Sequence, residues 1–449
     1  MNGELESSLT YHTGGSNMAR SLLDRPISSP AIAALGNTVE RTDIRSSLGP
    51  FKVFPHYKIT YPEVVIDALG NLYDEYNTAF APLVVANREW KTDYTYCMPD
   101  GVPINWCVQI DMVGLPDAFL QQTAGMSEEA AREILRHEIF EIENSIAMYQ
   151  LLENFFSRNG QDSFFKTRFR AVLNDLRQRF GRPIALLAVT DEKYHAMMAS
   201  EFGNGYGLSD AEILDLSGFD RFFSPGEFRR HVEGNGGECK YLLYARTSDP
   251  VSKLRNPGSL VMHPLLGNSE MRRIIKQCAI TFNVDNPVWP IGDSQRINDT
   301  KEYMRPMRMA FQIATMEGLR SPEFQTYLHT QGLKPALVKL RCKPAKGTYG
   351  CYGHVAGVSI DGKKALARGL KDWGDYVVQP EMPTPVITNA TNGTAYTFID
   401  RNFFGMVDGR PVFLGGVRTL MPMDTTEARE GRIHGNSSTV YAEIVCEIV

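Results

Sequence analysis

A run of cationic residues followed by glycines, at residues 336–353, has the residue types and spacing best suited to chemistry in this chain. If its first part is a strand, alternate side chains share a face, and one face carries three cations, Lys339, Arg341 and Lys343. Gly347, Gly350 and Gly353 follow, and glycine lets a backbone approach a ligand closely and point N–H groups at it. Cations beside such a loop suit a polyphosphate. An exposed strand with a solvated face and an ordinary glycine turn would explain the same residues.

The composition is that of a soluble globular protein with more than one domain. At 449 residues the chain is too long for a single compact core, so two or three domains are expected. A hydrophobic share of 43% and a charged share of 22% exclude general disorder. The formal net charge of -5 lacks the basic excess of a nucleic-acid binder, so no nucleic-acid partner is expected and any cationic patch must be local.

The N-terminal residues and the cysteines narrow the class of protein further. The chain begins without a basic segment followed by an apolar one, and no run approaches the ~18 apolar residues of a membrane span. A cytoplasmic protein without a membrane partner is therefore expected. The seven cysteines include no Cys-x-x-Cys pair, so neither a zinc ribbon nor a redox motif is encoded locally.

The first 181 residues divide into an irregular arm and a helix-rich region. Residues 1–50 show little apolar periodicity and are expected to form a mobile arm, with order starting near Phe51. Apolar spacing then predicts helices at 64–76 and 163–180 and a half-buried strand at 106–113. Ser127 is a good N-cap and two glutamates follow it, which predicts a helix from there through Leu151 and Phe156 to Gly160.

Residues 182–300 alternate between strand and helix patterns. The apolar run at 184–189 has the length of a buried strand and is followed by helix caps. Two further strand patterns, at 240–245 and 259–262, and a helix pattern at 268–282 continue the alternation. Such alternation predicts a small open α/β sheet.

The remaining residues combine one long helix pattern with several strand patterns. The helix pattern spans 293–318 and carries Lys301. Strand patterns follow at four places, 376–378, 395–404, 412–421 and 440–449. Asp408 and Gly409 lie between the second and third of these and form a typical two-residue hairpin turn.

The order of motifs in this C-terminal part resembles the ATP-grasp superfamily, whose members bind ATP between two small α+β lobes and commonly join a carboxylate to an amine. Five motifs of this chain carry the resemblance: Lys-Pro and a glycine-rich loop at 342–353, Val-Val-Gln-Pro-Glu at 377–381, Phe-Ile-Asp-Arg at 398–401, Gly-Gly-Val-Arg at 415–418 and Ile-His-Gly-Asn at 433–436. The loop and the Ile-Asp-Arg element are most similar to the bacterial ATP-grasp glutamate–cysteine ligases. The resemblance covers residues 301–449, about a third of the chain.

The sequence patterns and the resemblance together predict a mixed α+β and α/β architecture in four parts. A mobile arm (1–50) and a helix-rich region (51–181) would precede a pre-ATP-grasp-like α/β domain (182–300) and a two-lobe ATP-grasp domain (301–449). The α/β domain would form one wall of an acceptor pocket. Selectivity and a homodimer contact are two roles left open for the N-terminal region.

The resemblance also implies how ATP is held. Lys343 would reach the α- and β-phosphates and Lys301 would be the second family lysine, although Lys339 shares the face of Lys343 and Lys301 could equally be a solvated helix residue. The phosphates would be covered by four loop residues, Gly347, Thr348, Tyr349 and Gly350. The segment that reads adenine and ribose would contribute Val378, Gln379, Glu381 and Met382, with a plain buried strand as the alternative.

Magnesium is the metal that the resemblance implies, because phosphoryl transfer leaves negative charge that hard, oxygen-bound cations neutralise. Asp400 and Asn436 match the family's metal ligands best. His434 departs from the pattern, since many members have an acidic residue there. Either fewer protein ligands hold the metal, or Glu381 or Glu430 substitutes, or activity is impaired. An ion pair with Arg401 is the alternative for Asp400, but adjacent strand residues point to opposite faces.

The chemistry implied is an ATP-dependent ligation of small-molecule substrates, a carboxylate of an amino acid or small peptide and an amine. Lys343 and Arg418 are the expected catalytic residues, and Arg418 would stabilise the acyl-phosphate, unless it is a surface arginine on a strand. Alanine at either position is expected to abolish turnover in a folded protein. The alternatives are a phosphotransferase on the same fold and a nucleotide-binding regulatory protein with a decayed metal site.

Overall fold

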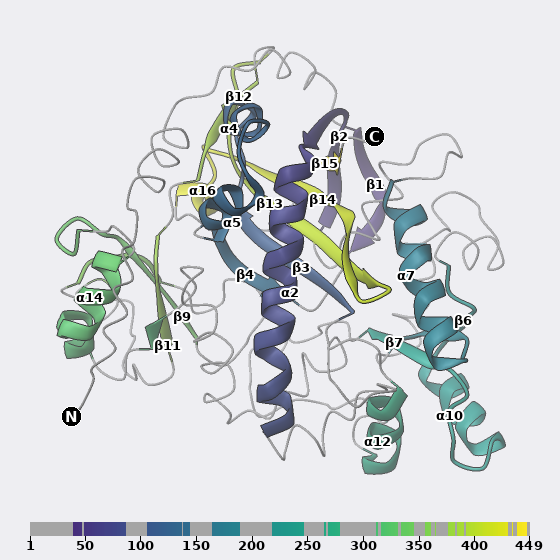
Figure 1. Cartoon of the computed structure of the whole chain (residues 1–449). Helices are drawn as coiled ribbons and strands as arrows, with labels where there is room; N and C mark the ends of the chain where they lie inside the picture. The colour runs from purple at the N-terminus through teal and green to yellow at the C-terminus, as the bar shows by residue number, and fades with distance from the viewer. Residues whose placement is uncertain are drawn as a thin grey trace, which may run out of the picture.

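The protein is a mixed α+β chain whose described strands form three sheets, with helices packed against them (Figure 1). The computed structural model describes residues 39–46, 49–86, 106–136, 138–143, 164–188, 218–246, 265, 268–278, 311–312, 316–330, 334–344, 355–360, 364, 376–381, 384–389, 392–429, 433 and 438–446.

The largest sheet has eight strands and draws them from both ends of the chain. Its order is β1-β2-β15-β14-β13-β3-β4, with β12 also paired to β13. All pairs are antiparallel except β2 with β15. The strands are β1 (Val39–Ser46), β2 (Gly49–Tyr61), β3 (Cys107–Val113), β4 (Ile139–Glu143), β12 (Val386–Thr388), β13 (Ala395–Val407), β14 (Arg410–Pro422) and β15 (Val440–Cys446). The ranges 51–181 and 301–449, expected to be separate regions, therefore share one sheet.

Hairpin β13–β14 is the centre of this sheet, and its turn is the one predicted from the sequence. Asp408 and Gly409 both have positive φ, 50° and 72°, as a two-residue type I′ turn requires. A bulge then shifts the pairing, because Phe404 lies opposite Phe413 whereas Phe403 lies opposite Gly415. Gly415 has a φ of 115°, which glycine adopts without strain. The bulge places Arg418, and not Val417, opposite Asp400.

Two expectations for the N-terminal region were wrong. Strands β1 and β2 begin inside the expected arm, because β1 pairs with β2 and β2 pairs with the C-terminal strand β15. The helix predicted from Ser127 to Gly160 is α5 (Glu128–Arg136), which ends at Arg136. Strand β4 (Ile139–Glu143) follows it and pairs with β3, so residues expected to continue the helix form a strand at the edge of the sheet.

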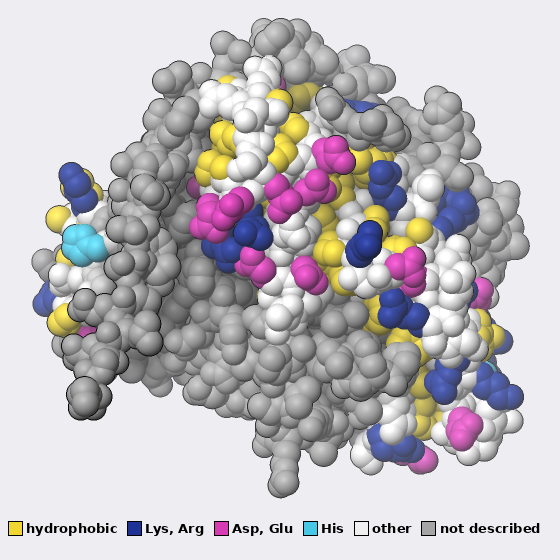
Figure 2. Space-filling model, in the orientation of Figure 1, with side chains coloured by type: hydrophobic (Ala, Val, Ile, Leu, Met, Phe, Trp, Pro, Cys, Tyr) yellow, Lys and Arg dark blue, Asp and Glu magenta, His cyan; other side chains and the backbone are white. Residues whose placement is uncertain are grey.

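Helices α2 (Glu63–Ala86), α4 (Asp117–Thr123), α5 and α7 (Phe164–Phe180) contribute to the core of the large sheet. Helices α2 and α7 confirm the predictions for 64–76 and 163–180, and the buried stripe of α7 is Phe165, Phe169, Val172, Leu173 and Leu176. Helix α5 lies on α2, and Asp and Glu side chains gather over this face (Figure 2). Two of the ion pairs there join Glu75 to Arg132 and Arg136 at 3.6 and 2.7 Å.

The second sheet is parallel, as the alternating pattern predicts. Its order is β6 (Arg221–Phe223), β5 (Ile184–Ala188) and β7 (Leu242–Arg246). Helices α10 (Pro225–Gly234) and α12 (Ser269–Cys278) share its hydrophobic core. The strand predicted at 259–262 lies outside the described residues.

The third sheet is small and carries the cationic strand. Its order is β10 (Val355–Val358), β9 (Leu340–Pro344), β11 (Tyr376–Pro380) and β8 (Phe311–Gln312). The prediction of one long helix at 293–318 was wrong for its last residues. Strand β8 and a 3-10 helix, η7 (Met316–Arg320), form there instead. Helix α14 (Pro322–Thr330) follows η7, and a short helix, α16 (Thr426–Arg429), follows β14.

The role of Gly415 in the bulge of the β13–β14 hairpin can be tested by substitution. Gly415→Ala should destabilise the protein by about 1–3 kcal/mol, because a side chain at this φ strains the backbone. Urea denaturation measures the change in the free energy of unfolding. Gly234→Ala at the end of α10 is the control, since a Cβ there meets nothing within 4 Å and its φ is not positive. Equal stability of the Gly415 variant and the control would contradict the assigned role.

Candidate functional site

The small sheet brings three of the predicted nucleotide-binding segments together. Strand β9 lies between β10 and β11, so the glycine-rich segment at 345–354 joins the adjacent antiparallel strands β9 and β10. On the other side, Lys343 lies opposite Val377, and Arg341 lies opposite Gln379. The cationic strand, the two ends of the glycine-rich segment and the strand expected to read adenine are therefore neighbours.

The structure describes the individual nucleotide-binding residues to different extents. Lys339 is exposed beside the start of β9, and Val378 is buried in β11. Lys343 and Gln379 are placed on their strands by their backbones, but their side chains are not among those described. Seven predicted residues lie outside the described part of the chain, namely Lys301, Gly347, Thr348, Tyr349, Gly350, Met382 and Asn436.

Glu381 uses its backbone and its side chain to bridge the small sheet. Its N–H donates to the carbonyl of Lys339 at 2.7 Å, which continues the pairing of β11 with β9. Its Oε1 accepts a hydrogen bond from the backbone N–H of Gly357 in β10 at 2.5 Å. The carboxylate expected to receive the ribose hydroxyls thus binds the backbone of the edge strand in this structure.

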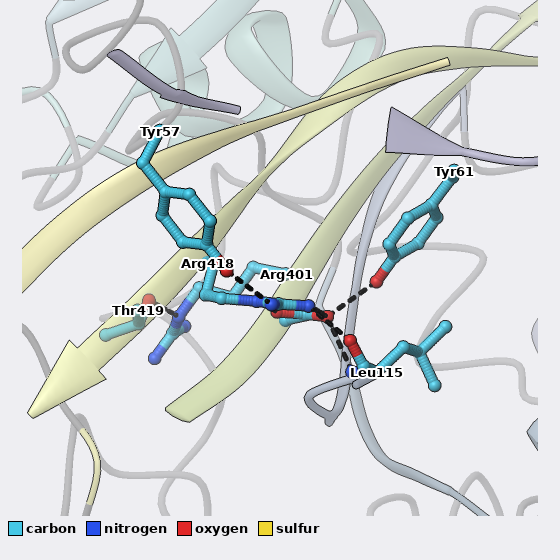
Figure 3. A network of polar contacts seen from close by, with 7 residues as sticks. Tyr57, Tyr61, Leu115, Arg401, Arg418 and Thr419 are labelled. Carbon is cyan, nitrogen blue, oxygen red and sulfur yellow. Dashed lines mark hydrogen bonds and ion pairs between the residues drawn. The ribbon is translucent and has the colours of Figure 1, made fainter. Parts of the chain in front are cut away.

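Asp400 and Arg418 lie opposite each other in the large sheet and form a buried ion pair (Figure 3). The guanidinium donates through Nε to Oδ1 and through Nη2 to Oδ2 of Asp400, both at 2.8 Å. Three further residues complete the network. The Tyr61 hydroxyl and the Leu115 N–H donate to Oδ2 at 2.7 and 2.8 Å, and Arg418 donates to the Leu115 carbonyl at 2.6 Å and to the Tyr57 hydroxyl at 3.3 Å.

The surroundings of this network favour an ionised Asp400–Arg418 pair beside a protonated Tyr61. Burial raises the pKa of Tyr61 well above its ordinary value, and the Asp400 carboxylate raises it further, so the phenol stays protonated and donates. Burial alone would lower the pKa of Arg418, but Asp400 raises it above the ordinary value for arginine. The guanidinium carbon also lies 4.2 Å from the centre of the Phe398 ring.

Asp400 in this arrangement does not fit a magnesium ligand. Its Oδ2 accepts three hydrogen bonds, its Oδ1 receives the Nε–H of Arg418, and the side chain has no solvent exposure. Magnesium needs carboxylate oxygens that face the metal and its phosphates. Within the described residues, no group of three or more His, Cys, Asp or Glu is placed to hold a metal.

The ion pair considered between Asp400 and Arg401 is absent, for the reason that strand geometry gives. Arg401 points to the opposite face of β13 and pairs with Asp111 of β3 at 2.8 Å. On this face a row of residues in register crosses five strands, Asp111, Arg401, Val417, Glu443 and Lys58. Glu443 pairs with Lys58 at 2.8 Å. The sequence analysis missed this row, since its members come from both ends of the chain.

The sequence analysis expected Arg418→Ala to abolish turnover without unfolding the protein. Because Arg418 is buried and paired with Asp400, we now predict that this variant is destabilised. Removing the guanidinium leaves the Asp400 charge buried and uncompensated, so Arg418→Ala should lose about 3–5 kcal/mol of stability. Chemical denaturation measures the loss. Arg410→Ala, at an exposed arginine of the same strand, should change stability by less than about 0.5 kcal/mol.

A double variant separates the effect of the unpaired charge from the effect of the lost side-chain volume. Asp400→Leu with Arg418→Met removes both charges and keeps apolar volume, so it should recover part of the stability that Arg418→Ala loses, while the Tyr61 hydroxyl and the Leu115 N–H and carbonyl lose their partners. A double variant as unstable as Arg418→Ala would show that the unpaired charge is not the main cause of the loss.

Comparison with known proteins adds no identification. No protein-family model matches the chain, and no curated protein matches it. Among the described helices, none combines the length and the apolar character needed to cross a membrane. The function is therefore argued from the geometry of the sheets and from the motifs they carry.

Proposed function

We propose that the protein is an ATP-dependent ligase that joins the carboxylate of an amino acid or small peptide to an amine. The observation that supports this proposal is the small sheet, in which the cationic strand β9 lies between β10, which follows the glycine-rich segment, and β11, which Glu381 follows directly. This arrangement supports the nucleotide-binding half of the proposal. The ligase half rests on the resemblance of the motifs to ATP-grasp ligases.

The dimensions of the small sheet suit an extended nucleotide. Glu381 and Lys339 lie at one end of the β9–β11 pair, and Pro344, after which the glycine-rich segment begins, lies at the other. Lys339 and Pro344 are five residue steps apart, which in extended chain is about 17 Å. That distance is comparable to the length of a nucleoside triphosphate with its base near Glu381 and its phosphates near the glycines.

The proposed chemistry is positioning and charge neutralisation. The γ-phosphate would pass to the substrate carboxylate, and the amine would attack the resulting acyl-phosphate to give an amide, ADP and phosphate. Lys343 would neutralise phosphate charge from the end of β9, whereas Lys339 precedes the strand and lies beside Glu381, at the end where the base would lie. Magnesium commonly supplies charge neutralisation in such reactions, but Asp400 as paired here does not fit as its ligand, so no step is assigned to the metal.

A second candidate function is a nucleotide-binding regulatory protein without ligase activity. The observation that favours it is the ion pair of Asp400 and Arg418, because it occupies two residues that the resemblance assigns to metal binding and catalysis. In this case the small sheet would still bind ATP, but the phosphoryl group would not be transferred.

Release of ADP in the presence of substrate pairs tests the proposal. The protein with ATP and magnesium should release ADP only when both an amino acid or peptide and an amine are present, and mass spectrometry should detect the amide. Lys343→Ala should lower turnover by about 100-fold or more, because one charge-stabilising group is lost. Lys334→Ala, at an exposed lysine before β9, is the matched control and should retain activity.

The other outcomes distinguish the alternatives. ADP release with an acid alone would indicate a phosphotransferase. No release with any pair, together with a higher melting temperature in ATP, would support the regulatory protein. Absence of both effects would overturn nucleotide binding and with it the proposed function.

A further inference from the structure

Three exposed cations, Arg182, Arg221 and Lys240, lie at one edge of the parallel sheet. Arg221 is the first residue of β6, and the other two each precede a strand, β5 or β7, by two residues. Because the three strands are parallel, their first residues meet at the same edge. Neighbouring strands are about 4.8 Å apart, so the three strand starts span about 10 Å. We call these three residues the cationic edge.

Arg182 and Lys240 approach the edge side by side. Ile184 lies opposite Leu242, and the Leu242 N–H donates to the Pro183 carbonyl at 2.9 Å, so the pairing continues beyond the first residues of the two strands. Arg182 and Lys240 each stand two residues before that pair. Two of the three positive charges therefore come from neighbouring segments of backbone.

His231 of α10 lies between Arg221 and Lys240 and contacts the surroundings of both. Its Nε2 accepts the backbone N–H of Lys240 at 3.3 Å. Its ring centre lies 5.1 Å from that of Phe223, and the Arg221 guanidinium carbon lies 4.7 Å from the centre of the same Phe223 ring. Burial lowers the pKa of His231, and the charges of Arg221 and Lys240 lower it further. The arginine and the lysine thus act on one imidazole from the two flanks of the sheet.

Within the described part of the chain, no carboxylate pairs with any residue of the cationic edge. Asp220 precedes Arg221, but its Oδ2 receives Arg177 at 3.0 Å and the N–H of Ile184 at 2.7 Å. Glu238 is exposed two residues before Lys240 and forms no ion pair with it. Like charges at this spacing repel one another, and an anion bound among them would remove the repulsion.

We propose that the cationic edge is a binding site for a small polyphosphate anion, which Arg182, Arg221 and Lys240 contact directly. The planar guanidinium fork matches phosphate oxygens, and the lysine ammonium adds a point charge. Three cations suit an anion with several negative charges, such as two linked phosphates. The inference does not rest on the proposed function, because this edge belongs to a different sheet from the one expected to bind ATP.

Acetylation of exposed lysines by acetic anhydride, read by mass spectrometry of the full chain, tests the site. Pyrophosphate at about ten times its dissociation constant should slow the acetylation of Lys240 about tenfold, because few molecules then have a free site. Lys334, an exposed lysine before β9, is the internal control and should react at the same rate throughout. An unchanged rate at Lys240 would overturn the proposal.

Two arginine variants show whether the other residues of the edge contact the same anion. Arg182→Gln and Arg221→Gln should each raise the pyrophosphate concentration that half-protects Lys240 by about fivefold, because one exposed charge is lost. Arg320→Gln, at an exposed arginine of η7, is the matched control and should leave this concentration unchanged. Equal concentrations in all three variants would count against a site shared by the three cations.

Two other anions identify the class of ligand. Sulfate at the same concentration should protect Lys240 less than pyrophosphate does, since it carries fewer charges. Equal protection by sulfate would show a general effect of anions, and protection by a single-stranded oligonucleotide alone would show a nucleic-acid surface, so either result would overturn the proposal. Failure at Lys240 leaves the proposed function intact, because that function is tested by ADP release and by Lys343→Ala.

Discussion

The ion pair of Asp400 and Arg418 is the constraint on which the large sheet depends. Two charged side chains with exposures of 0% and 1% are stable inside a protein only when each is paired and hydrogen-bonded. Their partners come from distant parts of the chain, because β2 supplies Tyr57 and Tyr61 and the segment after β3 supplies Leu115. The hairpin pairs the two charges with each other, and the N-terminal strands must assemble with it before the hydrogen bonds of both side chains are complete.

Charge pairing also specifies the register of β13. Asp400 and Arg401 are adjacent and point to opposite faces, where Arg418 and Asp111 respectively neutralise them. A slip of one residue would move every side chain of the strand to the other face and leave both charges beside the wrong partners. The bulge at Gly415 belongs to the same arrangement, because it shifts the pairing by the one residue that brings Arg418 opposite Asp400.

Local signals predicted much of the fold, and long-range pairing explains what they missed. The helix at 163–180, the parallel strand at 184–188 and the turn at 408–409 follow from apolar period and turn chemistry, which neighbouring residues determine. The sequence also disfavoured Arg401 as a partner of Asp400, since adjacent strand residues point to opposite faces. It did not indicate Arg418, because a two-residue turn without a bulge pairs Asp400 with Val417. The bond from Tyr61 to Asp400 spans 339 residues, and no local pattern predicts it.

The two groups of predicted site residues differ in what a ligand must overcome to engage them. Arg418 could reach a phosphate only by leaving Asp400 unpaired in the interior, which costs about 3–5 kcal/mol. Glu381 is only partly buried, and turning it away from Gly357 gives up one charge-assisted hydrogen bond, worth about 1.5–3 kcal/mol. The smaller cost lies in the small sheet. The contact of Glu381 is therefore the easier of the two to exchange, whereas the Asp400–Arg418 pair acts as a fixed part of the core.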